Sequence, residues 1–320
     1  MEWRNIILRI SVVVTTYNGK MHLEKQLLSL LQQERAPDEV LIFDDGSTDG
    51  TIELVQSFIR KNCLESWQFY VNAKRKGWKQ NFMEGLRKAA GDILFPCDQD
   101  DIWYPKKLAE MTAVMEQHPE IKLLACDYRV LYEPGALKAT VYKKTPAETQ
   151  GLITRYGFTR HFFMNPYPGC TYAVRRDFFD AVKELWFDGS PHDEFLWLMA
   201  AVQDGAWFYN RVLMDYVRYS DNASGVRYKD VALQKENLRY IHKQLCALQS
   251  FAAEHPDAVP VERCKMLAAA QIWCAKRQKL METRNLFRWL ALAPWWGYYN
   301  SPRNCLSDLW RLVCGAFKRQ

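Results

Sequence analysis

The first hundred residues alternate between strand and helix patterns, and this alternation limits the fold more than any other feature. Residues Ile10–Thr16 form a largely β-branched run, which is typical of a buried parallel strand. Leucines in Met21–Gln33 then recur on one helical stripe. The alternation continues with strands at Glu39–Phe43, Trp67–Val71 and Ile93–Pro96, a helix capped by Thr48 or Asp49, and another helix over Asn81–Ala90. We therefore expect an α/β fold, with an open, mostly parallel sheet and helices on both faces.

Clusters of carboxylates follow two of these strands. Asp44 and Asp45 end the second strand, and Asp98, Asp100 and Asp101 follow the fourth. Because ligands of such sheets bind beyond the carboxyl ends of the strands, we expect all five side chains at one edge. Five like charges repel one another unless a cation lies among them. Oxygen ligands without histidine favour Mn²⁺ or Mg²⁺ shared with a phosphate.

Each acidic cluster has a simpler explanation when taken alone. Aspartate-rich turns are common, and Asp44–Asp49 could be a turn followed by a helix cap. The two clusters nevertheless share one sheet edge about fifty residues apart, which favours a nucleotide site. A Gly-rich phosphate loop after the first strand, expected of a sugar nucleotidylyltransferase, is absent from Thr15–Asn18. The sequence also contains no Gly-x-Gly-x-x-Gly, which disfavours a dinucleotide oxidoreductase.

The rest of the chain predicts a second half of the sheet followed by a helical region. Its elements are a helix at Lys106–Gln117, a strand at Leu123–Tyr128, a polar loop or lid to Thr149, strands at Pro166–Val174 and Trp207–Arg218, a helix at about Asp193–Gln203, and helices from Val231. We expect a catalytic domain at residues 1–225 and a helical region at 226–320. No apolar run reaches the ~20 residues of a membrane-spanning helix. The N-terminal segment is interpreted as a strand, not as a signal peptide.

Three ordered motifs resemble those of family-2 glycosyltransferases with the GT-A fold, particularly the rhamnosyltransferase-like enzymes of polysaccharide and O-antigen synthesis. They are Ser11–Asn18 (SVVVTTYN), Asp44–Thr51 (DDGSTDGT) and Asp98–Pro105 (DQDDIWYP). The resemblance implies that a nucleoside-diphosphate-sugar, such as a UDP- or dTDP-sugar, binds at this edge. It assigns donor binding to Thr15, Tyr17, Asp45 and Asp98, metal binding to Asp98, Asp100 and Asp101, and a place near the diphosphate to Lys76 or Lys79.

Sugar transfer also needs a base that takes the proton of the acceptor hydroxyl. His192-Asp193-Glu194 precedes an apolar helix and resembles the family's acidic motif at this place, which makes Asp193 the candidate base and Glu194 the reserve. An acidic first helical turn capped by Ser190 is the alternative. We expect an inverting, metal-dependent transfer of one sugar to a hydroxyl of a cell-surface glycan or lipid-linked acceptor. A non-catalytic glycan-binding or scaffold protein of this fold is the rival hypothesis.

One motif departs from the subgroup that the chain resembles. That subgroup has Arg and His where this chain has Val217 and Tyr219, within Tyr216–Gly225. If the family's histidine helps to bind metal or diphosphate, its contribution is either absent here or replaced by Arg218. The identity of the donor is accordingly left open.

The C-terminus holds the basic character of the chain. Residues 261–320 contain 11 Lys/Arg and 3 Asp/Glu, and they also contain five of the twelve tryptophans. Basic residues beside clustered tryptophans predict that this segment binds an anionic membrane surface, and we expect no nucleic-acid partner. Nine scattered cysteines without a Cys-x-x-Cys pair predict reduced thiols, and hence a cytoplasmic protein. The apolar residues that we expect to contact the membrane are Leu286, Phe287, Trp289, Leu290, Trp295, Trp296, Tyr298, Tyr299, Leu306, Leu309, Trp310, Val313 and Phe317. Alternatively, the same residues pack onto the catalytic domain.

Overall fold

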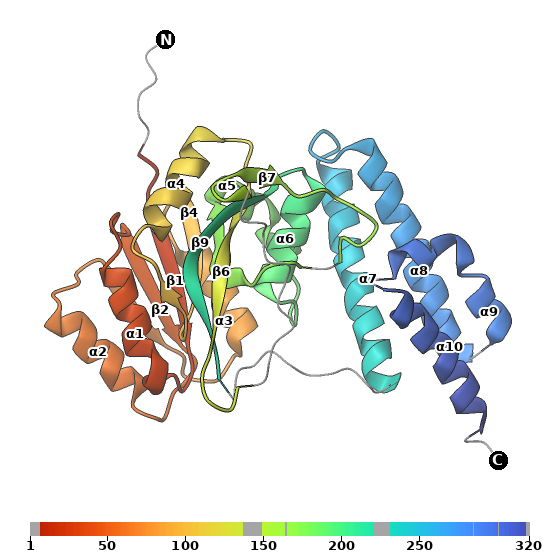
Figure 1. Cartoon of the computed structure of the whole chain (residues 1–320), viewed down its shortest axis with the longest axis horizontal. Helices are drawn as coiled ribbons and strands as arrows, with labels where there is room; N and C mark the ends of the chain where they lie inside the picture. The colour runs from red at the N-terminus through yellow and green to blue at the C-terminus, as the bar shows by residue number, and fades with distance from the viewer. Residues whose placement is uncertain are drawn as a thin grey trace, which may run out of the picture.

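The computed structural model describes residues 7–136, 149–163, 165–219, 231–283, 285–299 and 301–317. A layered α/β region is followed by a group of helices at its side (Figure 1). The expected lid between the strand at 123 and Thr149 lies largely outside the described residues, as does the expected boundary at residue 225.

Four parallel strands form the first half of the sheet, as the sequence predicts. They are β1 (Ile10–Thr16), β2 (Glu39–Asp44), β3 (Trp67–Val71) and β4 (Ile93–Asp98), in the spatial order β3-β2-β1-β4. The helices between them are α1 (Lys20–Leu31), α2 (Thr51–Lys61) and α3 (Trp78–Lys88). Gly50, with φ +93°, precedes α2 at the position expected for Thr48 or Asp49. Asp49 instead accepts hydrogen bonds from both the amide and the hydroxyl of Thr51.

The second half of the sheet mixes parallel and antiparallel pairs. It contains β5 (Ile102–Trp103), β6 (Leu123–Tyr132), β7 (Ile153–Arg155), β8 (Tyr172–Arg175) and β9 (Ala206–Arg218). β8 runs antiparallel to β4 and β6, whereas β6 and β9 run parallel. The sheet therefore continues β4-β8-β6-β9-β5, with β7 paired to β9. The open α/β sheet expected from the sequence is therefore present.

Two expectations for this half were wrong in detail. The strand expected at Pro166–Val174 is only β8, because a 3₁₀ turn at Gly169–Thr171 precedes it. Prolines such as Pro166 cannot donate a ladder hydrogen bond, which explains the shorter strand. The strands β5 and β7 were not expected, since two or three residues are too few to show an alternating pattern.

Helices cover both faces of the sheet, as expected. Leu27 of α1, Val55 of α2 and Met111 of α4 (Lys107–Gln117) pack on one face with side chains such as Val12. Phe82 of α3 packs on the other face, together with α5 (Arg176–Val182) and α6 (His192–Val202). Both faces of the central strands are consequently buried.

The C-terminal helices share the second of these two cores. They are α7 (Val231–Glu254), α8 (Val261–Thr283), α9 (Leu286–Leu290), a 3₁₀ turn at Ala293–Tyr298, and α10 (Pro302–Phe317). Leu245 and Trp273 belong to the same buried cluster as Phe195 of α6. Arg263 also donates hydrogen bonds to the carbonyl of Ala201 and to the carboxylate of Asp204. The helices therefore pack onto the catalytic region, with α7 nearest to it (Figure 1).

The aromatic residues of the C-terminal region divide into two groups. Trp289, Tyr298 and Tyr299 are buried and cannot face a lipid surface. Large apolar side chains that remain exposed are Leu286, Phe287, Leu290, Trp296, Leu306 and Trp310. The side chains of Val313 and Phe317 lie outside the described part of the chain. Among the described residues, no helix is long and apolar enough to cross a membrane.

Candidate active site

The first two motifs are bound to each other at the carboxyl edge of β1 and β2. The hydroxyl of Thr16 donates to Asp44, 2.7 Å from Oδ2, and the amide of Ser47 donates to its Oδ1 at 2.7 Å. The amide of Asn18 donates to the Ser47 hydroxyl at 2.8 Å. Asp44 is fully buried, so its carboxylate stabilises the turn and does not face a ligand.

Asp45 fixes the loop between β3 and α3. Its carboxylate accepts hydrogen bonds from the amide of Lys76 at 2.7 Å, the amide of Gly77 at 2.8 Å and the side chain of Asn72 at 3.1 Å. Gly77 has φ +86°, a conformation that a side chain would strain. If Asp45 binds the nucleoside as predicted, its carboxylate would do so while also holding this loop in place.

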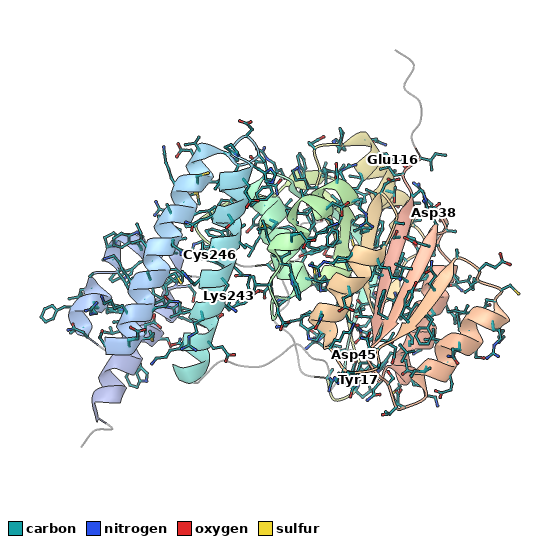
Figure 2. The ribbon with its side chains drawn as sticks, turned by 180° about the vertical axis from the view of Figure 1, so that it is seen from behind. Tyr17, Asp38, Asp45, Glu116, Lys243 and Cys246 are labelled. Atoms are coloured by element: carbon teal, nitrogen blue, oxygen red, sulfur yellow. The ribbon has the colours of Figure 1, made fainter. Side chains whose placement is uncertain are left out.

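Tyr17 lies close to Asp45 at the same edge (Figure 2). The guanidinium of Arg75 stacks on the Tyr17 ring, 3.9 Å from its centroid, and Arg75 Nε lies 3.8 Å from Asp45 Oδ2. Gln99 of the third motif binds the backbone of Tyr17 on both sides, at 2.8 Å to the amide and 3.2 Å to the carbonyl. Thr15 is nearly buried and pairs in register with Asp98. The three motifs are thus joined into one edge.

The two lysines expected near the diphosphate have other partners. Lys76 Nζ forms an ion pair with Glu84 at 2.6 Å. Lys79 Nζ donates to the carbonyl of Gly189 at 2.6 Å and lies over the ring of Trp78. The Lys79 contact lies at Gly189, three residues before the first residue of α6, the helix that carries the candidate base.

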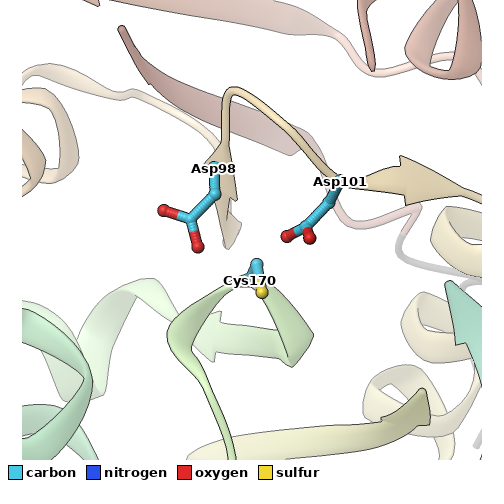
Figure 3. Close-up of side chains that lie close together, drawn as sticks. All are labelled: Asp98, Asp101 and Cys170. Atoms are coloured by element: carbon cyan, nitrogen blue, oxygen red, sulfur yellow. The ribbon is translucent and has the colours of Figure 1, made fainter. Parts of the chain in front are cut away.

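The third motif brings two of its three aspartates together. Oxygens of Asp98 and Asp101 and the sulfur of Cys170 all lie within 4.8 Å of one another, and the three side chains are neighbours (Figure 3). Asp101 has 0% exposure, and its Oδ1 accepts from the amide of Val217 at 3.4 Å. Its Oδ2 has no hydrogen-bond partner among the described residues. A cation would satisfy this buried oxygen, and carboxylate oxygens suit Mn²⁺ or Mg²⁺.

The electrostatics of this group also favour a cation. Burial, with the charges of Asp100 and Asp193, raises the pKa of Asp98 to about 7. Burial, with the charges of Asp100 and Asp98, raises the pKa of Asp101 well above its usual range. The buried ammonium of Lys107 offsets part of this repulsion. A divalent ion would stabilise the ionised carboxylates much further.

Asp100 is not one of these three residues, although its charge acts on Asp98 and Asp101. It shares a hydrogen bond with the hydroxyl of Tyr219, the residue that stands where the resemblance expects histidine. The Tyr219 ring stacks on His22 at 4.4 Å between centroids. Asp100, His22 and Glu133 line a cavity of about 300 Å³. Tyr219 therefore retains a contact with the acidic motif, whereas metal binding by Asp100 stays a prediction.

The candidate base lies at the beginning of α6. Asp193 Oδ1 accepts from the amide of Glu194 at 2.9 Å, and Asn165 donates to Oδ2 at 3.3 Å. Burial, with the charge of Glu194, raises the pKa of Asp193 to about 7. A Cβ on Gly169 would lie 2.4 Å from His192 Nε2 and 3.0 Å from Asp193 Cβ, so the turn that carries Cys170 closely contacts the base. This pKa suits a general base near neutral pH.

Glu194 faces the C-terminal region. The hydroxyl of Tyr240 in α7 donates to Glu194 Oε2 at 2.7 Å. Gln244 donates in turn to the Tyr240 hydroxyl at 2.7 Å, and Ser190 lies 3.3 Å from the same oxygen. This network occupies the carboxylate of Glu194, which leaves Asp193 as the better-placed base. Ser190 takes part in it and does not cap α6 in the described structure.

Sequence reasoning missed Cys170, Lys107 and the contribution of Tyr240. A signal existed for Lys107, because it lies on the same helical stripe as the buried Met111 and Met115. Cys170 gave none, since it falls inside an expected strand. The partner of Glu194 comes from a helix about fifty residues later, and no local pattern reports such a pairing.

Comparisons with known proteins agree with this geometry. A sequence model of the family described as "Glycosyl transferase family 2" matches residues 11–178, more than half of the chain. The chain is 24% identical over 228 residues to dTDP-rhamnosyl transferase RfbG of Shigella flexneri, covering 66% of this chain and 73% of that protein. It is 30% identical over 155 residues to the poly(ribitol-phosphate) beta-N-acetylglucosaminyltransferase TarS of Staphylococcus aureus, covering 48% of this chain but only 26% of TarS.

Solved structures show the same fold over almost the whole chain. S. aureus TarS 1-349 in complex with UDP-GlcNAc aligns with a TM-score of 0.61 at 18% identity, covering 98% of this chain and 92% of that one. The mannosyltransferase PcManGT from Pyrobaculum calidifontis, in complex with GDP-Man and Mn²⁺, aligns with a TM-score of 0.50 at 17% identity, covering 96% and 87%. The chain therefore belongs to glycosyl transferase family 2 and is a glycosyltransferase with the GT-A fold.

Proposed function

We propose that this glycosyltransferase moves one sugar, with inversion of its anomeric configuration, from a nucleoside-diphosphate-sugar to a hydroxyl of a cell-surface glycan or lipid-linked saccharide. The observation that carries the proposal is the convergence of two carboxylate sites on one turn. Asp98 and Asp101 surround the side chain of Cys170, while Asp193 contacts the adjacent Gly169. A donor phosphate and an acceptor base would then lie on opposite sides of the reacting sugar.

The donor would bind across the edge that the three motifs form. Tyr17, stacked by Arg75, offers an aromatic face for a nucleobase, and Asp45 holds the adjacent loop. UDP- and dTDP-sugars are the proposed donors, because one similar protein is a dTDP-rhamnosyl transferase and another was solved in complex with UDP-GlcNAc. Asp98 would lie between the nucleoside and the diphosphate, since it ends β4 beside Thr15.

Asp98 and Asp101, with Asp100 joining them, would hold Mn²⁺ or Mg²⁺. When bound, such an ion neutralises the charge that develops on the diphosphate leaving group. The chain itself would supply the base: Asp193 accepts the proton of the acceptor hydroxyl while Asn165 and the Glu194 amide hold its carboxylate in place. The single carboxylate base on the acceptor side agrees with a direct, inverting displacement.

Nucleotide binding in the presence and absence of metal tests this assignment. Calorimetric titration of UDP and dTDP into the full chain should show Mn²⁺-dependent affinity, and Asp98→Asn should abolish that dependence. Asp257→Asn changes an exposed carboxylate in the loop between α7 and α8 and serves as the control. Equal Mn²⁺-dependent affinity in folded Asp98→Asn and in wild type would refute the metal assignment. NMR of the glycoside product would determine its anomeric configuration.

We further propose that the C-terminal helices hold the enzyme on an anionic membrane surface on the cytoplasmic side. The supporting observation is the set of exposed apolar residues on α9 and α10, with Phe287 at 80% and Trp310 at 68% exposure. The segment around them carries the basic excess of the chain. Apolar side chains beside basic ones favour the lipid interface, with about 1 kcal/mol for each basic residue near an anionic surface.

Co-sedimentation with anionic vesicles tests the membrane proposal on the full chain. Wild-type protein should pellet with phosphatidylserine vesicles at low salt and be released as salt increases. The double variant Phe287→Glu/Trp310→Glu should remain in the supernatant, whereas Val261→Glu, also 68% exposed but at the start of α8, should behave as wild type. If wild type ignores these vesicles at low salt, the exposed residues have another partner.

A further inference from the structure

Cys170 is a buried thiol at the acidic motif for which the proposed transfer has no use. Its sulfur, an oxygen of Asp98 and an oxygen of Asp101 all lie within 4.8 Å of one another (Figure 3). Cys170 is 1% exposed, so its thiol faces these carboxylates and not the solvent. The 3₁₀ turn at Gly169–Thr171 fixes this orientation.

The cluster also holds an unsatisfied polar atom, which is independent evidence for a ligand. Asp101 is completely buried, and beyond the weak thiol donor of Cys170 its Oδ2 has no hydrogen-bond partner among the described residues. Figure 3 shows this carboxylate next to the Cys170 side chain. Buried polar atoms without partners are rare in folded proteins, and a bound ion is one of their ordinary explanations.

The mixture of donor atoms indicates which ions the site prefers. Mg²⁺ and Mn²⁺ bind oxygen ligands, whereas Zn²⁺ and Cd²⁺ bind thiolate sulfur together with carboxylate oxygen. We propose that Asp98, Asp101 and Cys170 form a site for a thiophilic divalent cation such as Zn²⁺ or Cd²⁺, which shares two carboxylates with the proposed Mn²⁺ or Mg²⁺ site. On binding, the Cys170 thiol releases its proton to solvent and its sulfur bonds to the metal.

The geometry requires only a small contraction. Bond lengths of about 2.0 Å to oxygen and 2.3 Å to sulfur in a tetrahedral site place ligand atoms roughly 3.5 Å apart. Ligand atoms within 4.8 Å would therefore move together by about 1 Å. Lys107 supports the arrangement, because its Nζ donates to the Cys170 carbonyl at 2.5 Å. Its positive charge offsets part of the negative charge of Asp98 and Asp101.

Cd²⁺ titration of the full chain, followed by ultraviolet thiolate-to-cadmium absorption, tests the site without nucleotide or turnover. The starting protein should be the Cys63→Ser/Cys246→Ser variant, because both of these thiols are exposed and would bind Cd²⁺ on their own. We expect one equivalent of Cd²⁺ to produce the band, and Cys170→Ser to remove it. Cys126→Ser, another buried thiol outside the cluster, should keep the band. A band of unchanged intensity in folded Cys170→Ser would overturn the proposal.

Two further measurements keep the test decisive. If Cys170→Ser does not fold, alkylation followed by peptide mass spectrometry can be done on the protein with Cys170 intact. Bound Cd²⁺ should slow modification of Cys170 at least tenfold and leave Cys126 unaffected.

Raising the Mn²⁺ concentration should shift the Cd²⁺ titration to higher concentration, since both ions would use Asp98 and Asp101. Unchanged alkylation, or a titration indifferent to Mn²⁺, would contradict the shared site. The band requires no donor, so a failed glycosyl-transfer assay would not affect this result.

Discussion

Two buried aspartates, one in each region of the molecule, have opposite surroundings. Asp308 of α10 accepts hydrogen bonds from Arg277 at 2.6 and 3.1 Å and from the hydroxyl of Tyr299 at 2.8 Å. Asp101 is equally buried, yet its Oδ2 has no partner among the described residues beyond the weak thiol donor of Cys170, and its neighbour Asp98 is a second carboxyl group that raises its pKa. The paired carboxylate holds helices together, whereas the unpaired one is arranged for a ligand.

The largest expected effect concerns the paired site. Asp308→Asn leaves the buried guanidinium of Arg277 without its counter-charge, so we expect the variant to lose about 3–5 kcal/mol of unfolding free energy. Chemical denaturation measures this loss. A change below about 1 kcal/mol would show that the Arg277–Asp308 pair does not hold α8 to α10.

A smaller loss of unfolding free energy is expected at Gly169, where the turn that carries Cys170 contacts the beginning of α6. Gly169→Ala adds a Cβ that would lie 2.4 Å from His192 Nε2, and a buried clash of this kind costs about 1–3 kcal/mol. Turnover should decrease along with stability, because Asp193 follows His192 in α6. Gly157→Ala, whose Cβ would meet no atom within 4 Å, is the control. Wild-type stability and turnover in Gly169→Ala would show that this close approach is not needed.

The smallest effect should have the opposite sign. Asp101→Asn keeps the shape of the side chain and removes a carboxyl group whose ionisation burial and neighbouring carboxylates disfavour, so in metal-free protein near neutral pH we expect unchanged or slightly greater stability, by less than about 1 kcal/mol. Thermal unfolding in a chelating buffer compares it with Asp308→Asn. Strong destabilisation of metal-free Asp101→Asn would mean that Asp101 is a structural residue like Asp308.

The sequence predicts the first half of the fold well because every element there has a local pattern. Buried parallel strands such as β1 are largely β-branched runs, and acidic motifs follow β2 and β4 directly. The second half depends on short strands and on distant pairings. β5 has two residues, and the partner of Glu194 is Tyr240. Such contacts are determined by tertiary packing, which local patterns do not report.

The same contrast applies to individual site residues. Asp98, Asp101 and Asp193 could be proposed from motifs, because two acidic clusters end at one sheet edge and three motifs resemble those of a known family. Motifs could not separate Asp101, which joins Asp98, from Asp100, which bonds to Tyr219. Nor could they separate the buried Trp289 from the exposed Trp310 in the C-terminal region. Both distinctions depend on which way each side chain faces.

The pH dependence of transfer tests the proposed base in the wild-type enzyme. A base must be ionised, and burial with the charge of Glu194 raises the pKa of Asp193 to about 7. We therefore expect kcat/KM with saturating Mn²⁺ to increase as pH rises through about 7, and to fall about tenfold per unit below pH 6. An aspartate with an ordinary pKa would stay active down to about pH 4. A rate that is constant from pH 5 to 8 would contradict this assignment.

The most direct test of the account compares Asp193→Asn with Glu194→Gln in one assay of turnover and donor binding. Removing the base should lower kcat by about 10²–10⁴-fold in Asp193→Asn while the affinity for nucleotide with Mn²⁺ stays near that of wild type. Glu194→Gln should retain much more of its turnover, because its carboxylate is bonded to Tyr240. Loss of turnover in Glu194→Gln but not in Asp193→Asn would contradict the central claim that Asp193 is the base.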